Sequence, residues 1–272
     1  MVLPKKHLGQ HFLRDENIAR KIIGMLDPAA GVVLEIGPGM GVLSKYLLEI
    51  QGIDPWFMDV DSESVEYLKA TYPGAADRFL LADFLKTDLS GFPPSANCNP
   101  PATHCDPPSA NPTPFTILGN FPYNISTQIL FRVLEFRDRI PEVTGMFQKE
   151  VAERIAAPPG SKTYGILSVL LQAFYNIEYL FTVSESVFYP PPKVKSAVIR
   201  LRRNETKKLE CDESLFFKLV KTAFNQRRKT LRNSLSILGP VELGEFSGCR
   251  PEQLGVEEFV RLTKLFIPLH HQ

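Results

Sequence analysis

The chain has 272 residues, of which 44% are hydrophobic, and its formal net charge at pH 7 is +1. A chain of this length can bury a sizeable core and fits one large domain, or one domain with a small appendage. It has no run of about eighteen apolar residues that would span a membrane, and residues 1–13 lack the apolar stretch of a signal peptide, so we expect a cytoplasmic protein.

The predicted elements alternate between short apolar strands and helical segments. A first helix begins after Asp15 or Asn17, either of which would cap it, and a second covers residues 42–50. The strand-like runs are residues 32–37, 56–60, 78–83, 115–120 and 143–148. This alternation predicts an α/β fold with a doubly wound, Rossmann-like sheet, in which ligands bind at the carboxyl ends of the strands.

Residues 93–113 interrupt the alternation with three consecutive seven-residue repeats, PPSANCN, PPATHCD and PPSANPT. Such proline-rich, low-complexity sequence has no apolar residues for a core and predicts an extended loop inserted between two strands. Cys98, His104 and Cys105 are only three candidate ligands, and two of them arise from drift between the repeats, so we expect no metal site.

The character of the chain changes after Arg203. A charged connector leads to residues 214–224, whose apolar positions fall on one helical face, and further short helices follow. We therefore expect residues 1–203 to form the α/β domain and residues 204–272 a small all-helical domain. Between Lys207 and Arg232 there are eight basic residues and three acidic ones, a local excess that favours a polyanionic partner.

A glycine-rich turn follows the first predicted strand, at Gly37–Gly41. Glycines there permit a tight turn and close approach of a ligand to the backbone. A nicotinamide dinucleotide site would have glycine where Val42 stands, and the carboxylate of Glu35 would disfavour a pyrophosphate but accept a cationic sulfonium. The turn thus favours S-adenosylmethionine over a dinucleotide.

Two acidic residues stand at the ends of the next two strands. Asp59 follows Gly37 by 22 residues, the position of a carboxylate that accepts hydrogen bonds from ribose hydroxyls. Asp83 ends the third strand, where it could bind an adenine amino group. Considered alone, Asp59 is an equally good cap for a helix that begins at Ser62.

The sequence Asn120-Phe121-Pro122-Tyr123 follows the fourth strand. An aromatic amine is a weak nucleophile, and a site activates it by accepting hydrogen bonds from both of its N–H groups. The Asn120 side-chain oxygen and the Pro122 carbonyl are suitable acceptors, and Tyr123 can stack on the base. The same four residues also occur in ordinary turns, so their position at a strand end carries the prediction.

Taken together, these motifs resemble the ribosomal RNA adenine N6-dimethyltransferases, a family that includes the erythromycin-resistance methylases. The matching segments span nearly the whole chain in the expected order: GQHFL (9–13), LEIGPGMGVLS (34–44), GNFPYNIS (119–126), FQKEVAERI (147–155), YGILSV (164–169), VFYPPPKVKSAVIRL (187–201) and FNQRRKTLRNSL (224–235).

The resemblance implies a Rossmann-like methyltransferase sheet with S-adenosylmethionine as methyl donor. It places His11 and Leu13 over the cofactor, and Phe188 as a second aromatic face for the target base, although Phe188 could equally be a core residue. The remaining cofactor contacts would come from Gly37, Asp59, Asp83 and Asn120.

The segment RRKTLRNSL resembles the dimethylases of small-subunit RNA more than the resistance methylases. In that branch, two adjacent adenines in a hairpin loop near the 3′ end of the RNA are dimethylated within a pre-ribosomal particle during ribosome biogenesis. The helical domain would bind the RNA backbone, and its phosphate contacts would be Arg227, Arg228, Lys229 and Arg232. We expect a monomer.

Two alternatives are a large-subunit RNA adenine methylase that confers antibiotic resistance and a non-catalytic ribosome-assembly factor. The intact Asn120, Pro122 and Tyr123 argue against loss of activity. The chain departs from the family pattern at His11, where many bacterial members have asparagine, and at the repeat of residues 93–113.

Overall fold

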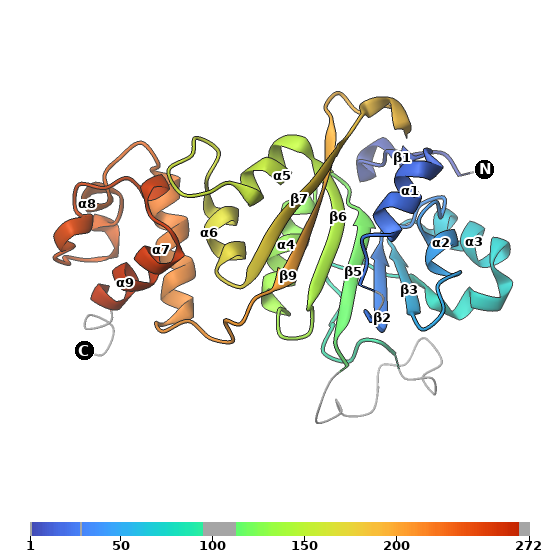
Figure 1. Ribbon diagram of the computed structural model, residues 1–272, viewed down its shortest axis with the longest axis horizontal. Coiled ribbons are helices and arrows are strands. Elements are labelled where there is room, and N and C mark those ends of the chain that lie inside the picture. The colour runs from blue at the N-terminus through green and yellow to red at the C-terminus, as the bar shows by residue number, and fades with distance from the viewer. Residues whose placement is uncertain (1, 28, 95–112, 267–272) are drawn as a thin grey trace. The chain divides into compact units, whose positions relative to one another are not determined.

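The computed structural model describes residues 2–27, 29–94 and 113–266. The chain divides into two compact units (Figure 1). The first comprises Met1–Lys149 and Glu178–Arg202, and the second Glu150–Ile177 and Arg203–Gln272. No helix among the described residues is long and apolar enough to cross a bilayer.

Seven strands of the described residues form one sheet, in the order β4-β3-β2-β5-β6-β9-β7. Neighbouring strands from β4 to β6 pair in parallel, whereas β9 pairs antiparallel with β6. The strands are β2 (Val32–Ile36), β3 (Asp54–Asp59), β4 (Phe79–Leu81), β5 (Phe115–Asn120), β6 (Glu142–Gln148), β7 (Tyr175–Val183) and β9 (Ser196–Arg203). This sheet confirms the predicted doubly wound α/β fold.

Helices cover both faces of the sheet because the strand order reverses at β2. The chain passes from β2 outward to β3 and β4, then crosses to β5 and β6 on the other side of β2. Right-handed crossovers therefore place α2 and α3 on one face and α4 on the other (Figure 1). The helices of this unit are α1 (Glu16–Ile23), α2 (Ser44–Leu47), α3 (Ser62–Thr71) and α4 (Ser126–Glu135).

The first of these faces contains a continuous hydrophobic core. Ile22 of α1, Leu47 of α2 and Leu68 of α3 belong to one cluster with side chains from the sheet, among them Val33 and Phe57. Asp15, one of the two expected caps, begins α1 by accepting hydrogen bonds from the next backbone N–H groups. Helix α2 is shorter than the expected 42–50 because turns flank it on both sides.

Strands β7 and β9 were not predicted. β7 alternates irregularly between buried and exposed residues, as a strand at the edge of a sheet can. β9 ends in basic residues, of which Arg200 pairs with Glu178 at 2.5 Å and Arg202 pairs with the buried Glu142 at 2.9 Å. Part of the basic excess in residues 193–203 is therefore neutralised within the sheet.

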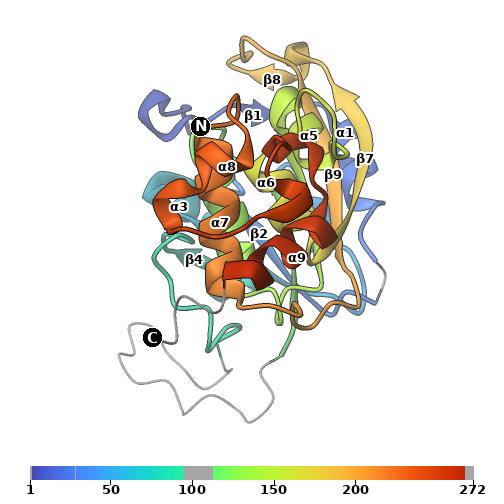
Figure 2. The same ribbon diagram turned by 90° about the vertical axis from the view of Figure 1, so that its left-hand side faces the viewer.

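The second unit is helical, as expected for residues 204–272, but it also includes residues 150–177 (Figure 2). The reason is α6, whose residues 167–171 are all buried and which contacts α7 and α9. α7 buries the apolar face that the sequence predicted. The helices are α5 (Lys149–Ala156), α6 (Ile166–Gln172), α7 (Glu213–Asn225), α8 (Leu231–Ser234) and α9 (Val256–Phe266).

Residues 95–112 of the proline-rich repeat, including Cys98, His104 and Cys105, lie outside the described residues. Both ends of the repeat meet at Arg139. Its guanidinium donates hydrogen bonds to the carbonyls of Leu89, Ser90 and Phe92 before the repeat and of Thr113, the last residue of the repeat. These ends lie at the amino end of β5, whose six residues place them about 20 Å from the carboxyl end.

Phe121 fixes the segment that follows β5. Its ring is 1% exposed and lies against two glycines that face each other in the sheet, Gly119 of β5 and Gly145 of β6. A Cβ on Gly145 would come within 2.2 Å of the ring, and one on Gly119 within 2.8 Å. Glycine at these two positions makes room for the ring, and the buried ring in turn holds residues 120–123 at the end of β5.

We expect Gly145→Ala to displace Phe121 and to lower the free energy of unfolding by roughly 1–3 kcal/mol, as overpacking does in other cores. Urea denaturation measures the change. Gly74→Ala is the matched control, because a Cβ there meets no atom within 4 Å. Equal midpoints and slopes for the two variants would show that the ring does not depend on Gly145.

Candidate active site

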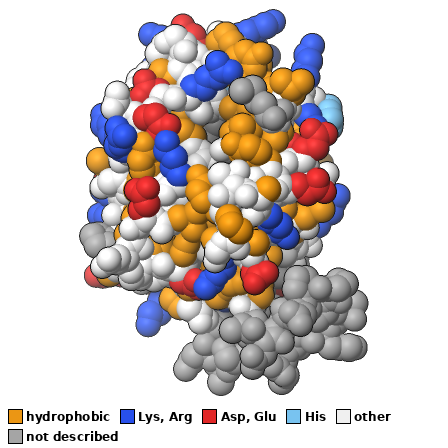
Figure 3. Space-filling model, turned by 90° about the vertical axis from the view of Figure 1, so that its right-hand side faces the viewer, with side chains coloured by type: hydrophobic (Ala, Val, Ile, Leu, Met, Phe, Trp, Pro, Cys, Tyr) orange, Lys and Arg blue, Asp and Glu red, His pale blue; other side chains and the backbone are white. Residues whose placement is uncertain are grey.

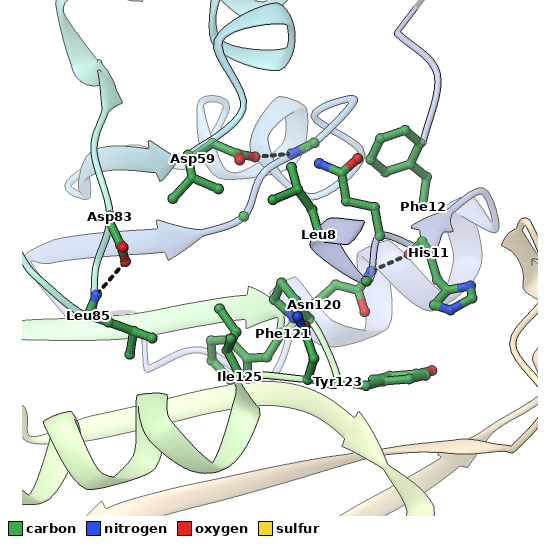
Figure 4. A pocket seen from close by; sticks show the side chains of 17 residues that line it. Leu8, His11, Phe12, Asp59, Asp83, Leu85, Asn120, Phe121, Tyr123 and Ile125 are labelled. Atoms are coloured by element: carbon green, nitrogen blue, oxygen red, sulfur yellow. Dashed lines mark hydrogen bonds between the residues drawn. The ribbon is translucent and has the colours of Figure 1, made fainter. Parts of the chain in front are cut away.

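A cavity of about 200 Å³ lies at the carboxyl ends of the parallel strands. It sits between β2 and β5, where the strand order reverses and where doubly wound sheets bind ligands. Its walls come from residues 8–12, the turn after β2, the ends of β3 and β4, and residues 120–125 (Figure 4). Seven of the predicted site residues line it: His11, Gly37, Asp59, Asp83, Asn120, Pro122 and Tyr123.

Asp59 connects the glycine turn to the end of β3. One carboxylate oxygen accepts a hydrogen bond from the Gly39 N–H at 3.2 Å and the other from the Asp61 N–H at 2.9 Å. Burial raises the pKa of this carboxyl, and the backbone hydrogen bonds oppose the rise. The cap of α3 is Asp61, so the alternative role of Asp59 as a helix cap does not hold.

The glycine turn is closed on one side by the N-terminal segment. Gly39 has a φ of +54°, which disfavours other residues, and a Cβ there would lie 2.8 Å from the ring of Phe12. The segment is held in place by Lys5, whose ammonium lies 2.5 Å from the buried carboxylate of Asp61. The Gln10 side-chain oxygen accepts a hydrogen bond from the Lys5 backbone N–H at 2.8 Å, and its amide nitrogen donates to the Asp61 carboxylate at 3.4 Å.

Glu35 does not contribute a charge to the cavity, which corrects one argument made from the sequence. It is 1% exposed, lies outside the cavity wall, and accepts a hydrogen bond from the Ser44 hydroxyl at 2.7 Å. Burial raises its pKa to about 8, so the side chain is neutral at pH 7. The choice of a sulfonium over a pyrophosphate cannot depend on this residue.

The far end of the cavity combines an acid with apolar side chains. One oxygen of Asp83 accepts the Leu85 N–H at 2.9 Å, and the other lies 3.3 Å from the exposed Lys86 ammonium. Val60 follows Asp59 in the chain, Leu85 lies close to Asp83, and both apolar side chains line the cavity. Val60 is 48% exposed. This arrangement can hold a flat heterocycle between apolar surfaces with a carboxylate at its edge.

Asn120 is oriented by the N-terminal segment. Its amide nitrogen donates to the His11 carbonyl at 2.8 Å, and no described residue is found to donate to its side-chain oxygen. Pro122 presents its carbonyl to the Ile125 N–H at 3.2 Å, which leaves a second lone pair. The Tyr123 hydroxyl lies 2.5 Å from the Ser196 hydroxyl, and burial raises the pKa of Tyr123.

Leu13 and Phe188 do not line the cavity. Phe12–Leu13 (β1) pairs antiparallel with Phe188–Tyr189 (β8), and Leu13 stands opposite Phe188. Both belong to the hydrophobic core, with exposures of 4% and 3%. Since neighbouring strand residues point to opposite sides, Phe12 faces the cavity instead. The side chains of Leu13 and Phe188, expected at the cofactor and at the base, are therefore packed in the core and not on the cavity wall.

The four basic residues expected to contact RNA lie in the second unit and differ in their surroundings. Arg228, Lys229 and Arg232 are exposed, but Arg227 is partly buried. Arg227 donates to the Ser161 carbonyl at 3.3 Å and lies 3.8 Å from the Glu252 carboxylate, so it has a structural role within the unit. By contrast, the side of the first unit at the right of Figure 1 mixes side chains of both signs (Figure 3).

Several residues of the cavity wall were not among the site residues predicted from the sequence. Leu8, Phe12, Val60 and Leu85 line the cavity as apolar side chains. For Val60 a signal did exist, because it directly follows a predicted acidic strand end. Among the described residues, no group of three or more His, Cys, Asp or Glu side chains could hold a metal ion.

Comparisons with known proteins point to one family. A family model described as ribosomal RNA adenine dimethylase matches residues 2–257. The chain is 54% identical to the ribosomal RNA small subunit methyltransferase A of Parabacteroides distasonis, over 97% of this chain and 94% of that protein. It is 55% identical to the protein of the same name from Flavobacterium johnsoniae, over 97% and 95%.

The fold is also similar to solved structures. A dimethyladenosine transferase from Plasmodium falciparum superposes with a TM-score of 0.74 at 24% identity, over 95% of this chain and 98% of that one. The 23S rRNA methyltransferase ErmE superposes with a TM-score of 0.64 at 24% identity, over 93% and 99%. At these identities the likeness concerns the fold alone.

The buried Glu35 leads to a prediction for stability against pH. The folded protein retains the Glu35 proton up to about pH 8, whereas the unfolded chain loses it near the ordinary pKa of 4.5. The folded state therefore binds more protons in this window, and the free energy of unfolding falls as the pH rises through it. The loss is at most about 1.4 kcal/mol per pH unit.

Glu35→Gln should remove this dependence while keeping an acceptor for the Ser44 hydroxyl. We expect the variant to gain stability over the wild type progressively between about pH 5 and pH 8, by a few kcal/mol at the upper end. Urea titrations at several pH values measure this, with the exposed Glu66→Gln as control. Parallel stability curves for Glu35→Gln and the wild type would contradict the prediction.

Proposed function

Because the chain belongs to the ribosomal RNA adenine dimethylase family, we propose that it dimethylates N6 of two adjacent adenines in small-subunit ribosomal RNA, with S-adenosylmethionine as methyl donor. The choice of the small subunit is supported by relatives of that name at 54–55% identity over nearly the full length of both chains. The observation that carries the chemistry is the orientation of Asn120 at the end of the cavity.

The cavity has the chemistry that S-adenosylmethionine requires. Asp59 would accept hydrogen bonds from the ribose hydroxyls, and Asp83 would accept one from the adenine amino group. Val60 and Leu85 would contact the faces of the adenine ring, and the backbone near Gly37 would lie along the methionine portion. When bound, the donor supplies a methyl group made electrophilic by the positive sulfur.

Residues 120–123 would position the acceptor amine. The Asn120 amide nitrogen is already bonded to the His11 carbonyl, so the side-chain oxygen is presented as an acceptor. That oxygen and the Pro122 carbonyl would accept the two N–H groups of the adenine amine, which favours pyramidal nitrogen and directs its lone pair at the methyl carbon. Stacking on Tyr123 would hold the ring, and water can take the proton from the methylated amine.

The exposed residues Arg228, Lys229 and Arg232 would contact RNA phosphates. Phosphate contacts give affinity and salt dependence without reading sequence, so the choice of adenine would rest with the cavity. A loop adenine is already partly unstacked, which lowers the energy needed to bring it into the site.

The activity is tested by incubating the protein with labelled S-adenosylmethionine and small subunits that lack the modification. We expect dimethyladenosine in the wild-type reaction and a loss of about 100-fold or more in turnover for Asn120→Ala, because a positioned polar contact is removed. Failure to label any RNA would refute the enzyme assignment.

Two controls separate the alternatives. Labelling of naked large-subunit RNA in preference to small subunits would indicate a resistance methylase. Tyr123→Ala should lose turnover in the proposed enzyme, whereas a non-catalytic assembly factor would keep its particle binding and its cellular function.

Reversing the exposed cations should weaken RNA binding without affecting the cofactor. The triple variant carries Arg228→Glu, Lys229→Glu and Arg232→Glu. We expect its RNA affinity to fall less steeply with salt: the magnitude of the slope of log affinity against log salt should drop by roughly one unit for each phosphate that is no longer bound. Lys69→Glu, an exposed charge reversal in α3 of the first unit, is the control. An equal loss of S-adenosylmethionine affinity in the triple variant would contradict the division of labour between the units.

A further inference from the structure

The face of Tyr123 that adjoins the N-terminal segment is covered. The imidazole of His11 stacks on the Tyr123 ring with a centroid distance of 5.4 Å and an angle of 28° between the planes. The two rings lie next to each other at one end of the cavity (Figure 4). The His11 ring nitrogen Nδ1 is 2.7 Å from the Pro190 carbonyl oxygen, so the ring is held by a hydrogen bond as well as by the stack.

This spacing leaves no room for a nucleobase between the rings. A base between them would need two stacking separations, each of roughly 3.4 Å as in a nucleic-acid duplex. A ring pair 5.4 Å apart cannot hold a base until one ring moves. The contact of the Tyr123 hydroxyl with Ser196 is partly buried, whereas the contact of the His11 ring with Pro190 is exposed to solvent, so we take His11 as the ring that moves.

The side chain and the backbone of His11 have separate partners. The His11 backbone carbonyl accepts a hydrogen bond from the Asn120 side-chain amide, and that bond does not involve the imidazole. Rotation of the ring therefore breaks the stack and the Pro190 contact but leaves the Asn120 oxygen where it is. The other aromatic residue expected at this place, Phe188, is buried in the core.

We propose that the His11 imidazole occupies the stacking position of the target adenine on Tyr123 and is displaced by it. The inference rests on the proposed function and adds a specificity-determining residue to it. A base must replace the His11 stack and also donate both amine hydrogens to Asn120 and Pro122. Adenine meets both requirements, so His11 reduces occupation of the site by bases that can only stack.

Kinetics of His11→Asn and His11→Ala test the proposal, with His7→Ala as a control for an exposed histidine outside the cavity. Both His11 variants keep the backbone carbonyl. We expect the KM for unmethylated small subunits to fall by about two- to tenfold, the equivalent of one aromatic pair, with the KM for S-adenosylmethionine unchanged.

A weaker affinity for S-adenosylmethionine with an unchanged KM for small subunits would overturn the proposal and assign His11 to the cofactor. An unchanged KM for both substrates would overturn it as well. Binding of S-adenosylhomocysteine by each variant verifies that the cavity is intact.

Proton NMR separates this inference from the assigned activity, because it needs no turnover. The imidazole resonances of His11, identified by their loss in His11→Asn, should show ring-current shifts that disappear in Tyr123→Leu. A hairpin RNA with adenines in the loop, added with S-adenosylhomocysteine, should also abolish the shifts. Shifts that persist with the RNA bound would show that His11 is not displaced, whatever the outcome of the methylation assays.

Discussion

The hydrogen bond from the Asn120 amide to the His11 carbonyl joins two parts of the chain that are 109 residues apart. It fixes which atom of the Asn120 amide is available to a ligand. It also holds the N-terminal segment against the carboxyl ends of the strands, where Phe12 and Gln10 form the cavity wall. The proposed methyl-acceptor site and the wall of the proposed cofactor site thus share a single contact.

That contact depends in turn on packing beneath it. Phe121 is buried against Gly119 and Gly145, so the backbone at Asn120 has a defined position at the end of β5. The N-terminal segment is held separately by Lys5 and Gln10 on Asp61, two residues after Asp59. The backbone is thus held on both sides of the Asn120–His11 hydrogen bond. Such support is needed because a reactive amine must be aligned to within a fraction of an ångström.

The sequence was sufficient for features that are local. The glycine turn, the acids at strand ends and residues 120–123 were predicted because strand ends and turns have characteristic residues over a few positions. The features that escaped prediction depend on distant partners. Leu13 and Phe188 face the core because of a register between segments 175 residues apart, and the Arg227 guanidinium lies 3.8 Å from the Glu252 carboxylate. The neutrality of Glu35 follows from burial that the sequence does not reveal.

Arg139 has an evolutionary consequence. Its guanidinium donates to the carbonyls of Phe92 and Thr113, so the chain that leads into β5 is held at two points far from the cavity. The closure entropy of a loop grows only slowly with its length, by about 0.6 kcal/mol for each doubling. One seven-residue repeat can therefore be duplicated or lost in the gene without shifting β5. This sheet is a tolerant acceptor of foreign sequence at that point, a natural position for grafting a tag or a reporter domain.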